Sequence, residues 1–119
     1  MTKQAGRVPV REQDPKIRAT NFEEVCYGYN EEEAVAEAGR CLNCKKPRCV
    51  GGCPVSIDIP RFIHCVAEKQ FADAAAVIAE SSALPAVCGR VCPRKANAKA
   101  SAFWASRENR WPSASWNVL

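Results

Sequence analysis

Two short groups of cysteines constrain the fold more than any other feature of the sequence. Residues 41–54 read CLNCKKPRCVGGCP, with the spacing C-x2-C-x4-C-x3-C-P. The second group, VCGRVCP, holds Cys88 and Cys92 and again ends in proline. Iron–sulfur clusters are held by cysteine thiolates, often in runs that end in Cys-Pro. Gly51 and Gly52 should let the backbone turn tightly, because glycine accepts backbone angles that other residues resist. The spacing predicts most of a binding site for two clusters.

The remaining composition fits a small protein that depends on such sites. At 119 residues the chain forms one small domain, and small chains with many cysteines are commonly held together by metals or disulfides. The opening sequence MTKQAGRVPVREQDPK lacks the apolar segment of a signal peptide, and no apolar run approaches transmembrane length. We expect a cytoplasmic protein with reduced thiols, which favours cluster ligation over disulfides. A zinc knuckle on the same thiolates is the alternative.

The net charge of +4 is located entirely in the C-terminal tail. Residues 94–119 contain five basic side chains and one acidic side chain, whereas residues 1–93 are balanced. A basic stripe that could follow nucleic acid or lie on a membrane is therefore missing from the main part of the chain. We expect no nucleic-acid partner and no membrane partner.

The pattern before Pro93 is helical. Asn30 with Glu33 has the form of a capping box, and helices are expected over 31–43, 59–69 and 71–81. The first of these should deliver Cys41 and Cys44 from its last turn. No strand-like alternation occurs. The prediction is an all-α fold, a small helical iron–sulfur domain in which clusters replace much of a core, with an irregular C-terminal tail.

Local signals add further expectations for these helices. Asp14 and Asp58 are good candidates for N-caps. The apolar faces of the second and third helices are expected to point inward; their members are Ile59, Ile63, Val66, Phe71, Ala74, Ala75 and Ile78.

The stretch EEVCYGYNEEEAVAEAGRCLNCKKPRCVGGCPVSIDIPRFI, followed by LPAVCGRVCP, resembles a known family. It is similar to the N-terminal iron–sulfur domain of the small (beta) subunit of NADPH-dependent glutamate synthase, and to the N-terminal domain of dihydropyrimidine dehydrogenase. The resemblance covers residues 7–93. It implies an α-helical ferredoxin-like domain with two [4Fe-4S] clusters, ahead of domains that bind FAD and NADPH.

The resemblance also assigns ligands. One cluster takes Cys41, Cys44 and Cys49, with the last cysteine of the family's second motif as its fourth ligand. The other takes Cys53 and Cys92, one further cysteine and a polar side chain. We therefore expect the sulfurs of Cys41, Cys44 and Cys49 to point at one centre and Cys53 to point towards Cys92.

The other cysteines and the histidine receive ordinary roles. Cys88 has no ligand role in the resemblance and is interpreted as structural. Cys26 and Cys65 are expected to be small buried hydrophobic residues. His64 is interpreted as an ordinary packed or surface residue.

The chain departs from the family pattern directly after Pro93. The family's second motif runs C-G-x-V-C-P-x4-C-x3-C, but Ala98 and Ala102 stand where its last two cysteines belong. Loss of one base after the Pro93 codon would explain this, because re-reading the tail in the shifted frame can restore both cysteines. The interpretation divides the chain into an incomplete two-cluster domain, residues 1–93, and an out-of-frame tail, residues 94–119. Such a chain should not hold both clusters stably.

The function implied by the resemblance is electron transfer. In that family NADPH reduces FAD, and the clusters relay single electrons to another flavin or to the large subunit, which makes glutamate. This piece has no catalytic residues and no G-x-G-x-x-G fingerprint, so it would act as a module of a larger flavin oxidoreductase. The alternatives are a small zinc-binding interaction module and a non-functional truncated product.

Overall fold

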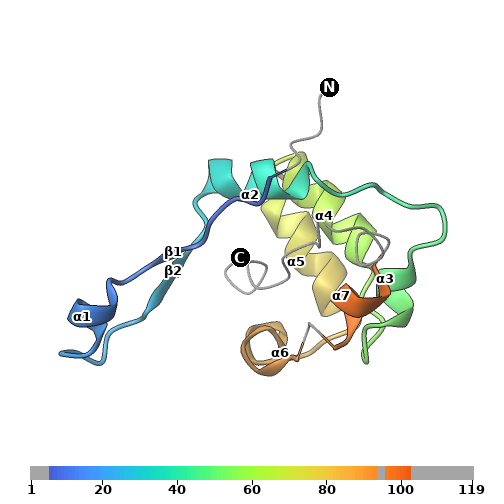
Figure 1. The fold of residues 1–119 in the computed structure, drawn as a ribbon. Coiled ribbons are helices and arrows are strands. Elements are labelled where there is room, and N and C mark those ends of the chain that lie inside the picture. Colours follow the sequence, from blue (N-terminus) through green and yellow to red (C-terminus); the bar gives the residue numbers. More distant parts are fainter. Residues whose placement is uncertain (1–5, 94–95, 103–119) are drawn as a thin grey trace.

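The computed structural model describes residues 6–93 and 96–102, and this part of the chain is mostly helical (Figure 1). The expected all-α class is confirmed, with the addition of one small sheet. The helices are α1 (Pro15–Arg18), α2 (Glu31–Ala38), α3 (Arg48–Gly51), α4 (Ile59–Ala67), α5 (Phe71–Ala79), α6 (Pro85–Val91) and α7 (Ala98–Ser101). The strands are β1 (Arg11–Glu12) and β2 (Cys26–Gly28).

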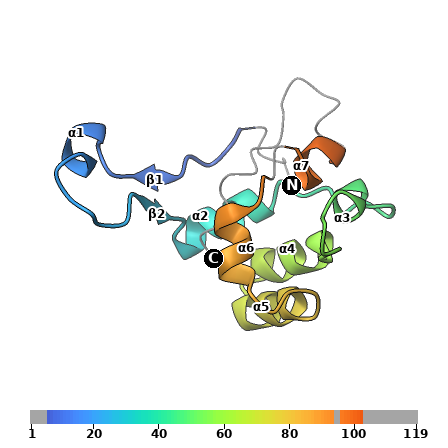
Figure 2. The same ribbon diagram turned by 90° about the horizontal axis from the view of Figure 1, so that it is seen from below.

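Residues 8–28 form an arm that projects from the helical body, with α1 at its tip (Figures 1 and 2). We call this segment the N-terminal arm. β1 and β2 pair in antiparallel orientation between the tip of the arm and α2, with an irregularity between Arg11 and Glu12 (Figure 1). Asp14 caps α1 by accepting a hydrogen bond from the Lys16 amide, as expected. The sequence predicted no strands, and this was wrong. Strands of two and three residues are too short to show a period-2 pattern of apolar residues.

The helical body is built on α4, which packs against both α5 and α2. Ile63 and Val66 of α4 are buried as predicted, and Ala74 of α5 meets them in the core. Ala75, expected to face inward, is exposed, and Val77 is buried instead. Positions 74 and 77 share a face of α5, since residues three apart are neighbours on a helix, whereas position 75 turns away.

The caps of the main helices follow the sequence, but α2 is shorter than predicted. Asn30 and Glu33 form a complete capping box, and Asp58 caps α4 through the amide of Arg61. The prediction that the first helix runs to residue 43 was wrong, because α2 ends at Ala38 and Gly39 follows as its C-cap. Glycine has a low helix propensity, and it stands where the chain leaves the helix. The ends of α4 and α5 each lie two residues before the predicted ends.

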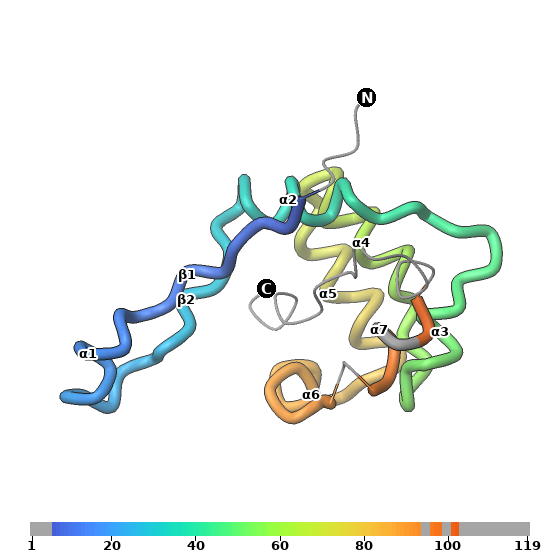
Figure 3. Tube along the Cα trace, in the orientation of Figure 1, coloured from blue at the N-terminus to red at the C-terminus, as the bar shows by residue number. Residues whose placement is uncertain are grey.

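Within the described ranges, no helix combines the length and the apolar character needed to cross a membrane. Most of the tail that was expected to be irregular, residues 103–119 together with 94–95, lies outside the described residues. The described part of the tail forms α7, which lies beside α3 (Figure 3).

Candidate metal-cluster site

The first cysteine group lies on the segment that connects α2 to α4. Cys41 follows the end of α2 and donates its backbone amide to the Ala38 carbonyl at 3.0 Å. Cys44 lies in the following loop, Cys49 lies in α3, and Cys53 comes after Gly52. The expectation that Cys41 and Cys44 lie on the last turn of the first helix was therefore wrong. All four side chains are half-buried, so a ligand could reach them.

Cys41 and Cys44 lie close enough to Cys49 to affect the ionisation of its thiol. Burial raises the pKa of Cys49, and the neighbouring Cys41 and, less strongly, Cys44 raise it further. Backbone hydrogen bonds partly offset these effects. A cysteine must lose its proton to ligate a metal, and an isolated thiolate here would be disfavoured by its surroundings. A cation bound at this point would compensate that cost.

The sulfurs do not yet converge on one point. In the part of the chain that the structure describes, no three cysteine, histidine, aspartate or glutamate side chains are gathered closely enough to hold a metal ion. The expectation that Cys41, Cys44 and Cys49 already point at one centre was therefore wrong for this structure. The direction of Cys53 towards Cys92 stays a prediction.

The second cysteine group lies on and just after α6. Cys88 lies in α6, and Cys92 is its C-cap, with the Cys92 amide donating to the Cys88 carbonyl at 3.0 Å. The buried hydroxyl of Ser82 donates to Cys88 Sγ at 3.6 Å, and the Asn97 side-chain amide donates to Cys92 Sγ at 3.8 Å. Neither donor was predicted, because no spacing rule connects Ser82 or Asn97 to a cysteine.

The tail returns to the first cysteine group through α7. A Cβ added to Gly52 would lie 2.8 Å from the Cβ of Ser101 and 3.1 Å from the Cα of Ala98. Gly52 has a φ of −84°, which any residue adopts, so glycine is needed here for close approach and not for a special backbone angle. Ala98, where the resemblance leads us to expect a cysteine, thus lies against the segment between Cys49 and Cys53.

The remaining candidates behave as ordinary residues. Cys65 is half-buried and packs against the core, and Cys26 is half-buried on β2, so neither reaches the full burial that was expected. His64 is exposed, in keeping with its interpretation as an ordinary residue. None of the cysteines, all of which fall in the described ranges, takes part in a disulfide.

The donor chemistry of the first group fits an iron–sulfur cluster. Iron–sulfur clusters are held by cysteine thiolates, and this segment offers half-buried cysteines, of which Cys41 and Cys44 lie near Cys49. The Asn97 side-chain amide adds a hydrogen bond to the sulfur of Cys92, and hydrogen bonds of this kind tune iron–sulfur sites.

Comparison with known proteins agrees with this chemistry. The model of the family described as dihydropyrimidine dehydrogenase domain II, 4Fe-4S cluster, matches residues 18–110. The glutamate synthase (NADPH) small chain of Halomonas elongata is 39% identical over 89 residues, which cover 75% of this chain and 19% of that protein. Its counterpart in Escherichia coli K12 is 40% identical over 79 residues, covering 66% and 17%.

A third relative has another printed function. The NAD-dependent dihydropyrimidine dehydrogenase subunit PreT of Salmonella typhimurium is 41% identical over 72 residues, covering 60% of this chain and 17% of that protein. The chain spans about a fifth of the length of the curated relatives it matches. The family match continues past Pro93, whereas the out-of-frame origin of residues 94–119 stays a prediction.

Proposed function

The chain belongs to the family of dihydropyrimidine dehydrogenase domain II, a [4Fe-4S] cluster domain, and we propose that it acts as an electron-transfer module of a glutamate synthase small-chain-like NADPH oxidoreductase. The observation that carries the proposal is the match of this cluster-domain family to residues 18–110, a range that contains all four half-buried thiols of the first cysteine group, Cys41, Cys44, Cys49 and Cys53. Thiolate ligation of a cluster would give the chain a centre for one-electron transfer.

A bound cluster would supply one-electron chemistry, and the protein would set its position and surroundings. Cys41, Cys44 and Cys49 would hold the first cluster between the end of α2 and α3. Cys53 and Cys92 would hold part of a second. Hydrogen bonds to the sulfurs and partial burial are the features by which a protein tunes the potential of such a centre, and Asn97 donates to Cys92.

The proposed partners are the FAD-binding and NADPH-binding parts of a flavin oxidoreductase and a glutamate synthase large subunit. The printed names of two relatives, NADPH-dependent glutamate synthase small chains, support these partners. In this proposal the chain works in the cytoplasm, where thiols stay reduced. Reduction of a pyrimidine by an NAD-dependent enzyme is the second possibility, favoured by the similarity to PreT.

We further propose that the two-cluster site is incomplete in this chain. Ala98 and Ala102 occupy the positions of the family's last two cysteines, and α7 brings Ala98 next to Gly52. The proposed cause is a shift of reading frame after Pro93, which resequencing of the gene from the Cys92 codon past the Leu119 codon would test.

The function is tested by anaerobic reconstitution with iron and sulfide. We expect brown protein with broad visible absorbance and matching iron and sulfide contents. Cys49→Ser should reduce both contents strongly. Cys65→Ser is the matched control, because Cys65 packs against the core and has no proposed ligand role, and it should leave both contents near the wild-type values. Colourless protein that binds zinc in place of iron and sulfide would overturn the electron-transfer proposal and favour the zinc module. Protein that binds neither would identify a non-functional product.

A further inference from the structure

Glu37 of α2 is a fully buried carboxylate with two different partners. Its exposed fraction is 0%, and it is one of the largest side chains among the described residues that are removed from solvent to this degree. Oε2 accepts a hydrogen bond from the Val8 backbone amide at 3.0 Å. Oε1 accepts one from Arg40 Nη1 at 2.6 Å, and Arg40 is itself only 6% exposed. A buried charge of this kind is tolerated only where it is paired and hydrogen-bonded.

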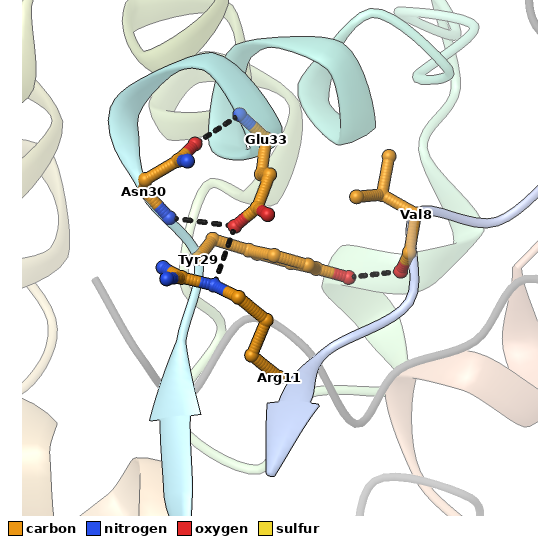
Figure 4. A network of polar contacts seen from close by, with 5 residues as sticks. All are labelled: Val8, Arg11, Tyr29, Asn30 and Glu33. Carbon is orange, nitrogen blue, oxygen red and sulfur yellow. Dashed lines mark hydrogen bonds and ion pairs between the residues drawn. The ribbon is translucent and has the colours of Figure 1, made fainter.

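The first partner belongs to the base of the N-terminal arm. The Val8 carbonyl accepts a hydrogen bond from the Tyr29 hydroxyl at 2.8 Å, so side chains of the body bind both polar backbone groups of Val8. Arg11 Nε lies 3.3 Å from Glu33 Oε2 on the first turn of α2. Figure 4 shows the Val8–Tyr29 bond and the Arg11–Glu33 pair side by side. The arm is thus attached to α2 by specific polar contacts at its base.

The second partner directly precedes a candidate ligand. The Arg40 amide donates to the Glu37 carbonyl at 3.1 Å, and the Cys41 amide donates to the Ala38 carbonyl at 3.0 Å. Cys41 also packs against the core. The backbone turn that positions Cys41 therefore begins at Glu37. The ion pair between the Arg40 and Glu37 side chains stabilises the same turn.

We propose that Glu37 is a positioning residue that couples docking of the N-terminal arm to the conformation of the turn that carries Cys41. The consequence for metal binding rests on the proposed function: a cluster held by Cys41 stabilises the docked arm, and the docked arm stabilises the cluster. This coupling is reciprocal, because two events linked by one free energy change each other's equilibrium by the same factor.

The first test measures hydrogen exchange of the Val8 and Cys41 amides in the iron-free protein. Glu37→Gln keeps the shape but turns an amide donor towards the Val8 amide or the Arg40 guanidinium, and it removes the buried carboxylate. We expect exchange at both amides to become about 10-fold faster or more. Glu80→Gln is the matched control, because Glu80 forms an exposed pair with Arg61, and exchange should change less than about 3-fold. Faster exchange at only one of the two amides would overturn the coupling.

A milder variant decides the question if Glu37→Gln does not fold. Tyr29→Phe removes the hydroxyl that binds the Val8 carbonyl and leaves Glu37 and Arg40 intact. We expect faster exchange at Val8 together with Cys41, and in protein reconstituted with iron and sulfide we expect faster iron release to a chelator. Faster exchange at Val8 alone contradicts the proposal. Failure of the wild type to take up iron would contradict the proposed function, while the exchange measurements on iron-free protein still decide the coupling.

Discussion

Asn30 and Glu33 show how two side chains define the start of α2. The Glu33 amide donates to Asn30 Oδ1 and the Asn30 amide donates to Glu33 Oε2, both at 2.8 Å. We predict that Asn30→Ala lowers the free energy of unfolding by about 1 kcal/mol, because an alanine leaves an N-terminal amide without its acceptor. Urea denaturation followed by circular dichroism measures this. Asn30→Ser is the control and should lose little, since serine caps helices nearly as well as asparagine; an equal loss in both variants would contradict the prediction.

Cys49 gives the metal-free protein a specific pH dependence. Burial and the neighbouring Cys41 and Cys44 raise the pKa of Cys49 in the folded protein, so folding favours the neutral thiol. This contribution to stability is present below the pKa of an unfolded thiol, roughly 8.5, and is lost as pH rises through the higher folded pKa. We therefore predict that the wild type loses more stability than Cys49→Ser between about pH 8 and about pH 10. Urea midpoints across that range measure it, and parallel curves would show that Cys49 contributes nothing.

At the scale of elements, the close contact between α3 and α7 requires a glycine at position 52, the C-cap of α3. Gly52→Ala keeps an ordinary φ but places a methyl group 2.8 Å from the Ser101 Cβ. We predict that α7 moves away from α3, because keeping the contact with the added methyl group would cost about 1–3 kcal/mol of strain. Limited proteolysis around residues 96–102 should become faster.

Two variants test the cause of that displacement. Gly51→Ala is the matched control, because a Cβ at position 51 meets nothing within 4 Å. Ser101→Gly in the Gly52→Ala background should slow proteolysis again in part, because it removes the Ser101 side chain but leaves the Ala98 Cα 3.1 Å from the added methyl group. Equal proteolysis of the Gly51 and Gly52 variants would rule out the steric explanation.

The elements that sequence reasoning could predict are those defined by neighbouring residues. Asp14, Asn30 and Asp58 cap helices through amides two or three residues away, so local pattern suffices. Contacts between distant segments could not be predicted in this way: the carboxylate of Glu37 binds the amide of Val8, which is 29 residues away, and no periodicity signals that contact.

The site was predictable to the same extent. Spacing identified both cysteine groups as candidates, because iron–sulfur ligands often come in short cysteine runs. It could not show how far the sulfurs converge, since that depends on packing between segments far apart in sequence. It also could not identify Ser82 as the donor to Cys88.

At the scale of the whole molecule, the core is small. The buried hydrophobic residues in the described ranges are mainly alanine and valine, with Tyr29 and Ile63 as the large members. Small domains with so little apolar burial commonly depend on metals, and the free energy of binding a metal then becomes free energy of folding. Completing the ligand set should therefore raise both the metal content and the stability of this chain.

We predict that Ala98→Cys combined with Ala102→Cys raises the iron and sulfide contents after anaerobic reconstitution, towards two clusters per chain. The reason is that α7 already brings position 98 next to the segment between Cys49 and Cys53. Iron and sulfide assays with visible absorbance measure this. Ala96→Cys, at an exposed position outside the family spacing, is the control for an added thiol. Unchanged contents in the double variant would contradict the view that these two positions lack ligands.

Two of the contacts that attach the arm to the helical body should respond differently to salt. Arg90 of α6 binds Glu24 at 2.6 Å through side chains that are more than half exposed, whereas Glu37 and Arg40 are almost completely shielded from solvent. Dissolved ions screen exposed charges over about 8 Å at physiological ionic strength and about 3 Å at 1 M, but they screen buried pairs far less. High ionic strength should therefore release α6 from the arm while Val8 stays bound to α2. Raising the salt concentration would then change the attachment of the helix that carries Cys88, and of Cys92 after it, while the turn at Cys41 stays unchanged.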